Sequence, residues 1–215
     1  MDRRFRSHTG FRSHTVCFIA LSALTQVFNS AAQAPVLQLS GGDFPDLTLH
    51  KPVFDERGNQ LAMACDQIRA RRIDELDPLW KRAVERIHLD CEDLKEEDAG
   101  FDMVATVVTG FLRPGTVQFA GLPVAEIRLM DSDLWSDHQY LLQLPYAQAR
   151  AQLKSFLESR CHAQQDRPGA LMEQSCALTD TEAGLYLEAS ELGGIWVHAE
   201  EDNPARTVYA EAWSD

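Results

Sequence analysis

The chain has 215 residues, of which 45% are hydrophobic and 25% charged, and its formal net charge is −13. This length suits one domain or two small ones tightly joined, and the excess of carboxylates argues against nucleic acid, whose phosphates would repel the protein. Such acidity favours a basic partner or serves solubility alone.

Residues 1–32 have the order of a secretory signal peptide. Four arginines precede an apolar run of about 13 residues, Val16 to Phe28, and small residues follow it. The run is shorter than the roughly 18 residues that cross a bilayer, so we expect export without a membrane span. Ser30 and Ala32 place cleavage after Ala32, which predicts a periplasmic chain that begins near Gln33. Removing four arginines and one aspartate from 20 basic and 33 acidic side chains leaves 16 and 32, a net charge of about −16.

Four cysteines remain after this cleavage: Cys65, Cys91, Cys161 and Cys176. An even number in an exported chain predicts two disulfides. Proximity in sequence favours Cys65 with Cys91 and Cys161 with Cys176, although four cysteines allow two other pairings. Zinc is not expected, because the chain lacks the C-x-x-C and H-x-x-x-H spacings that prepare a tetrahedral site.

The N-terminal part, residues 33–100, contains a predicted hairpin and a predicted helix. Residues 46–54 and 60–65 alternate around a turn at 55–59 that contains Gly58, although a helix over 59–72 also fits the spacing. Asp77 and Pro78 suit the cap and first position of a helix. Apolar residues then recur at helical spacing as far as Cys91, and a charged loop is expected at 92–98.

The C-terminal part, residues 101–215, reads as strands around one further helix. β-branched residues from Phe101 predict a strand that ends before Pro114 and Gly115. A helix is expected from Tyr146 to Arg160, where Ala149, Leu153, Phe156 and Leu157 form one apolar stripe, and residues 162–175 should form a loop. Further strands are expected at 116–120, 123–130, 139–144, 184–189, 194–199 and 207–213.

This order predicts an α+β fold, in which two main helices pack on one face of an antiparallel sheet. Two disulfides and an N-terminal signal peptide complete the expected architecture. The second part would form a β-β-α-β-β-β unit, packed with the first part as one compact unit.

Motifs of the common enzyme classes are missing from the sequence. The chain contains no G-x-S-x-G elbow, and neither the Walker nor the dinucleotide glycine loop occurs. Carboxylate pairs such as Glu188 with Glu191 are more typical of a solvated rim than of a glycosidase cleft. We therefore assign no catalytic residue, no cofactor and no metal.

The stretch DSDLWSDH, residues 131–138, is the strongest candidate site. Calcium loops of the helix-loop-helix kind need a central glycine and a terminal glutamate, and this stretch has neither. We interpret it as a contact loop, because tryptophan flanked by carboxylates is typical of binding surfaces. Burial of the tryptophan in the core remains the alternative. The predicted contact residues are Asp131, Asp133, Trp135, Asp137 and His138.

Taken together, the sequence favours a periplasmic protein that binds another protein. Its partner would be a basic, secreted cell-wall hydrolase, which an inhibitor or immunity-type protein would neutralise by steric and electrostatic occlusion. The alternatives are an exported hydrolase with an unrecognised carboxylate and histidine site, or a structural accessory of the cell envelope. The sequence does not determine the oligomeric state.

Overall fold

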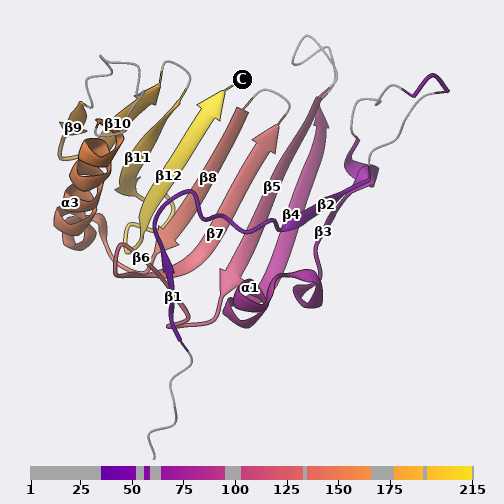
Figure 1. The fold of residues 1–215 in the computed structure, drawn as a ribbon, viewed down its shortest axis with the longest axis horizontal. Helices are drawn as coiled ribbons and strands as arrows, with labels where there is room; N and C mark the ends of the chain where they lie inside the picture. Colours follow the sequence, from indigo (N-terminus) through magenta and orange to yellow (C-terminus); the bar gives the residue numbers. More distant parts are fainter. Residues whose placement is uncertain are drawn as a thin grey trace, which may run out of the picture. The chain divides into compact units, whose positions relative to one another are not determined.

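The computed structural model describes residues 35–51, 56–58, 64–94, 103–132, 135–165, 177–190 and 193–214. Within these ranges, ten strands form one curled, mixed sheet, and residues 34–215 belong to one compact unit. The main run of the sheet is antiparallel, in the order β4-β5-β7-β8-β12-β11-β10-β9 (Figure 1). The predicted signal peptide lies outside the described residues.

The strands of the main run are β4 (Val84–Leu94), β5 (Met103–Leu112), β7 (Leu122–Ser132), β8 (Trp135–Leu142), β9 (Leu178–Asp180), β10 (Gly184–Ser190), β11 (Gly193–Ala199) and β12 (Thr207–Ser214). The start of β7 also pairs with β6 (Val117–Phe119), and β6 pairs with β1 (Leu37–Leu39), which is the parallel contact of the mixed sheet. A separate two-stranded sheet joins β2 (Thr48–His50) to β3 (Ile68–Ala70).

The α+β prediction with two main helices on one sheet face is wrong, because the protein is mostly β. The expected helix from Pro78 to Cys91 is helical only in α1 (Pro78–Ala83), and the chain continues as β4. Asp77 does cap α1, since its Oδ1 accepts the backbone N–H groups of Leu79 at 2.8 Å and Trp80 at 3.2 Å. Beyond the helix, Ile87, Leu89 and Cys91 alternate with polar residues, and pairing with β5 selects that two-residue period.

The expected hairpin also differs, because β2 pairs with β3 and not with residues 60–65. Most of residues 52–63, including the expected return strand up to Met63, lie outside the described residues. Before β3, Cys65–Gln67 forms a short 3-10 helix, η1, and a second, η2 (Ile73–Glu75), follows β3. The alternative helix over 59–72 is likewise not formed at its described end, where Ile68–Ala70 is a strand.

An N-terminal strap, residues 40–47, crosses one face of the sheet between β1 and β2 (Figure 1). The ring of Phe44 stacks on Tyr140 of β8 with centroids 4.4 Å apart. Leu47 is buried and lies against Gly110 of β5. At Gly41, which has a φ of +89°, a side chain would collide with the guanidinium of Arg160. The strap therefore closes this face over the middle of the sheet.

The second helix, α3 (Tyr146–Gln165), packs against β10, β11 and β12 on the same face as the strap. The predicted apolar stripe is confirmed: Ala149, Leu153 and Leu157 are fully buried, and Phe156 meets the ring of Phe119 at 4.9 Å. At the other side of the helix, Lys154 Nζ lies 2.9 Å from the Asp180 carboxylate of β9. Among the described residues, no helix is long and apolar enough to cross a membrane.

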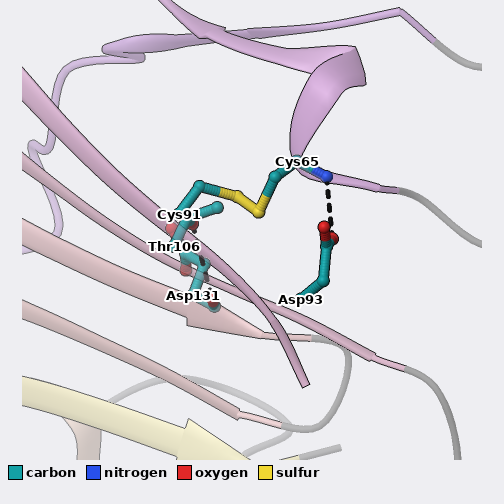
Figure 2. The surroundings of a disulfide bond; sticks show 5 residues. All are labelled: Cys65, Cys91, Asp93, Thr106 and Asp131. Atoms are coloured by element: carbon teal, nitrogen blue, oxygen red, sulfur yellow. Dashed lines mark hydrogen bonds between the residues drawn. A yellow bond between two sulfur atoms is a disulfide. The ribbon is translucent and has the colours of Figure 1, made fainter. Parts of the chain in front are cut away.

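The predicted Cys65–Cys91 disulfide is confirmed. It joins η1 to the middle of β4, and the backbone N–H of Cys65 donates to Asp93 of the same strand at 2.9 Å (Figure 2). The disulfide thus fastens the β2–β3 layer to an edge strand of the main sheet. Cys161 is also disulfide-bonded, whereas Cys176 lies outside the described residues.

Candidate functional site

The DSDLWSDH stretch is not the loop that its sequence predicts, because strands occupy most of it. β7 continues to Ser132 and β8 begins at Trp135, so that Asp131 lies opposite Ser136. The hydroxyl of Ser132 accepts the N–H of Trp135 at 3.1 Å and closes the turn. Asp133 lies outside the described residues. The remaining candidate residues are held in register on paired strands.

Strand alternation sends the candidate residues to opposite faces of the sheet. Asp131 and His138 lie on the face that the strap covers, where the ring of Phe44 meets that of His138 at 5.0 Å. Asp137 and Trp135 belong to the uncovered face, at the end of the sheet near the β7–β8 turn. The structure therefore brings Asp131 to His138 but separates this pair from Trp135 and Asp137.

Asp131 and His138 form a partly buried pair, with Nε2 of the imidazole 2.8 Å from Oδ1 of the carboxylate. Burial alone would raise the pKa of the Asp131 carboxyl. Hydrogen bonds from His138 and Ser136 outweigh that effect and hold this pKa below its ordinary value. The carboxylate is thus ionised in the neutral range. The His138 ring also meets Trp213 of β12 edge to face, with centroids 4.8 Å apart.

Trp135 faces solvent with 41% of its surface exposed, which answers the question that the sequence leaves open. It lines a groove of about 460 Å³ at the end of β8, β10, β11 and β12. Trp196 and Trp213 line the same groove and are 37% and 40% exposed. Tyr186 completes the aromatic set, and Asp137 and Glu188 supply carboxylates. We call this surface the tryptophan groove.

The floor of the tryptophan groove is made of small residues. The strand register places Glu188, Gly194, Ala212 and Asp137 in one row across four strands. A side chain at Gly194 would stand 2.7 Å from a ring carbon of Tyr186, so the ring occupies the space above this glycine. The rings of Tyr186 and Trp196 lie 5.1 Å apart and are inclined by 34°. The Tyr186 ring therefore covers Gly194 and forms one wall of the groove, Ala212 remains as its small-residue floor, and the row has a carboxylate at each end.

Asp137 is the electrostatically unusual member of this row. One oxygen, Oδ2, accepts a hydrogen bond from the Gln139 amide at 3.1 Å. The other, Oδ1, is buried and has no hydrogen-bond partner among the described residues. Burial raises the pKa of the Asp137 carboxyl, although Gln139 and the nearby charges of His138, His198 and Arg128 act against it. A buried carboxylate oxygen without a donor is an energetically unfavourable state.

A second groove, of about 530 Å³, lies beside β4, β5 and β7. Its main charged groups already have partners: Arg206 pairs with Glu126 at 2.7 Å, and the Arg86 guanidinium lies 3.8 Å above the ring of Phe111. This groove therefore presents fewer charged groups without a partner than the tryptophan groove does. Among the residues described, no group of three or more His, Cys, Asp or Glu side chains is placed to hold a metal ion.

Sequence reasoning missed four groove residues, Tyr186, Glu188, Trp196 and Trp213. They lie about 50 to 80 positions after Trp135 in the chain, and only the strand order β8-β12-β11-β10 brings them beside it. The predicted strand over residues 194–199 carried a local signal, since its alternation puts Trp196 on the face opposite Ile195 and Val197. No protein family model, curated protein or solved structure matches this chain.

Proposed function

We propose that this protein is a binding protein that holds a protein partner in the tryptophan groove. The observation that carries the proposal is the pair Trp135 and Trp196, each more than one third exposed, which lie on the uncovered face and line one groove. Tryptophan buries a large area for little loss of entropy and is enriched in binding hot spots. Exposed aromatic clusters of this kind mark interaction surfaces, whereas single exposed side chains do not.

The charge of the molecule supports a basic partner. The net charge is −13, and the charged groups among the described residues that line the groove are the carboxylates of Asp137 and Glu188. Such a field speeds the approach of a cationic protein and disfavours acidic ones. We propose a periplasmic inhibitor or immunity-type role, in which the protein covers the active site of a basic, secreted cell-wall hydrolase.

The Asp131–His138 pair is the observation that favours a second candidate function, that of an exported hydrolase. A carboxylate that orients a histidine at 2.8 Å is one part of a general-base arrangement. The imidazole, however, is packed between Phe44 and Trp213, and its side chain is 17% exposed. We therefore assign the pair a positioning role for Trp213.

A capture experiment tests the binding proposal. The immobilised full chain is exposed to an envelope extract, and bound proteins are identified by mass spectrometry, next to the variants Trp135→Ala and Leu79→Ala. Leu79 is the matched control because it is an apolar residue, 52% exposed, on α1. We expect stoichiometric capture of a basic hydrolase that is lost with Trp135→Ala, retained with Leu79→Ala and weakened by salt. Equal capture by both variants, or none by the unmodified chain, would overturn the proposal.

A further inference from the structure

We infer that the tryptophan groove recognises a lysine or arginine side chain of the partner, placed over Ala212 beside the Tyr186 ring, with Asp137 as its counter-ion. This inference rests on the proposed function and deepens it, because it names the chemical group that the groove takes. Three features carry it: the arrangement of the rings, the carboxylates at both ends of the row, and a carboxylate at Asp137 that no described cationic side chain pairs with directly.

The rings are arranged as cation recognition requires. An ammonium or guanidinium group is attracted to the face of an indole within about 6 Å of the ring centre. Trp135 enters from β8, on one side of the small-residue floor, and Trp196 with Tyr186 lies on the other side. The Tyr186 ring covers Gly194, whereas Ala212 presents only a methyl group, so a cationic side chain can lie over Ala212 between Tyr186 and Trp135.

The charges select a cation over an anion. Asp137 and Glu188 occupy the two ends of the row, three strand spacings or about 14 Å apart. Glu188 is exposed and can steer an approaching cation. Asp137 is half-buried and lines the same groove, so its negative charge acts on a cation placed over Ala212. An acidic segment would meet uncompensated repulsion at both ends of the floor.

The neighbours of Asp137 do not already neutralise it. On its own face, Gln139 donates to the other oxygen, and the positive groups that act on it from a distance are His138, His198 and Arg128. Arg128 is itself paired with Glu200, at 3.4 Å. The negative charge of Asp137 is therefore available to a ligand cation in the groove, because these positive groups act on it only from a distance.

A fluorescence titration tests the inference. The full chain is titrated with hexalysine, with hexaglutamate and with the neutral sugar cellohexaose, and the emission of the exposed tryptophans is followed. The variant Asp137→Asn keeps the size of the side chain and removes one charge. Its matched control is Asp74→Asn, which removes the same charge from an aspartate whose side chain is 59% exposed on η2. Trp196→Ala tests the aromatic wall.

We expect saturable binding of hexalysine that weakens at least tenfold with Asp137→Asn and with Trp196→Ala, but less than twofold with Asp74→Asn. Equal loss with both aspartate variants would show attraction by net charge alone and overturn the inference. Saturable binding of cellohexaose in place of hexalysine would overturn it in favour of a sugar ligand. Capture of a protein through Trp135 with no response to hexalysine would reject the cation while leaving the proposed function intact.

Discussion

The imidazole of His138 donates to the Asp131 carboxylate across β7 and β8 at 2.8 Å, and the same ring meets Trp213 of β12. Trp213 lies on the same strap face as this pair, because it pairs with Ser136 in the register of β12 with β8, and it reaches the rim of the tryptophan groove. His138 therefore holds in place an aromatic residue at the rim of the groove.

This link predicts coupling between His138 and Trp213. We expect His138→Ala to lower the free energy of unfolding by about 1–3 kcal/mol, because it removes ring contacts with Phe44 and Trp213 and leaves the Asp131 carboxylate without its partner. A double-mutant cycle with Trp213→Ala, followed by urea unfolding, should give a coupling energy of at least about 0.5 kcal/mol. Strict additivity of the two changes would contradict the positioning role.

The chain between Ala83 and Leu94 shows where sequence patterns were ambiguous. Ala83, Val84, Ile87 and Cys91 fit a helical period, and Ile87, Leu89 and Cys91 fit a strand period. Residues 84–94 form a strand because they pair with β5 along its length. This long-range contact is not visible in the local sequence pattern. The apolar stripe of α3, in contrast, fits one period only, and its helix was predicted correctly except for its end, which lies at Gln165 and not at Arg160, so that residues 162–165 are helical and not part of the expected loop.

The burial of the Asp137 carboxylate predicts that this residue lowers the stability of the fold while it supports binding. Its pKa in the folded protein lies above the ordinary value of 3.8, so folding disfavours the ionised form. The stability of the unmodified protein should therefore fall as the pH rises from about 3.8 through the raised pKa. We expect Asp137→Asn to raise the melting temperature at neutral pH, where the unmodified side chain is ionised, and to leave it unchanged at the acid end.

Calorimetry from pH 3 to pH 8 checks this expectation. The two proteins should melt together at the acid end, where both side chains are neutral, and diverge as Asp137 ionises. Asp74→Asn should show no such divergence. A lower melting temperature of Asp137→Asn at neutral pH would mean that the carboxylate stabilises the fold and that its burial carries no functional meaning.

The disulfide predicts a large loss of stability on its removal. Cys65 and Cys91 are 26 positions apart, and a cross-link of that span stabilises by about 3–4 kcal/mol through the entropy of the unfolded chain. We expect the double variant Cys65→Ser, Cys91→Ser to lose about this amount in urea unfolding. The loss should leave hexalysine binding unchanged, because β4 lies at the opposite edge of the sheet from β9 and β10. Loss of binding in a folded variant would show that the two edges are coupled.

Only part of the candidate site could be predicted from the sequence. Trp135 and its flanking carboxylates stood out locally, and their composition suggested binding over metal or catalysis. The division of Asp131 and His138 from Asp137 and Trp135 depends on where the strands end, because a strand in place of a loop sends alternate residues to opposite faces. The other groove residues depend on the crossover that places β12 between β8 and β11. Long-range strand pairing of this kind cannot be predicted from any short stretch of the sequence.

A substitution at Gly194 tests whether the position of the Tyr186 ring shapes the groove. Its neighbours leave no room for a methyl group, which would stand 2.7 Å from Cε2 of Tyr186 and 3.1 Å from the carbonyl oxygen of Leu187. We expect Gly194→Ala to cost about 1–3 kcal/mol through overpacking and to push the Tyr186 ring into the groove, which should abolish hexalysine binding. Adding Tyr186→Ala should relieve the ring clash, so Gly194→Ala should cost less in that background. An equal cost in both backgrounds would assign the strain to the Leu187 carbonyl and remove Tyr186 from the argument for a shaped floor.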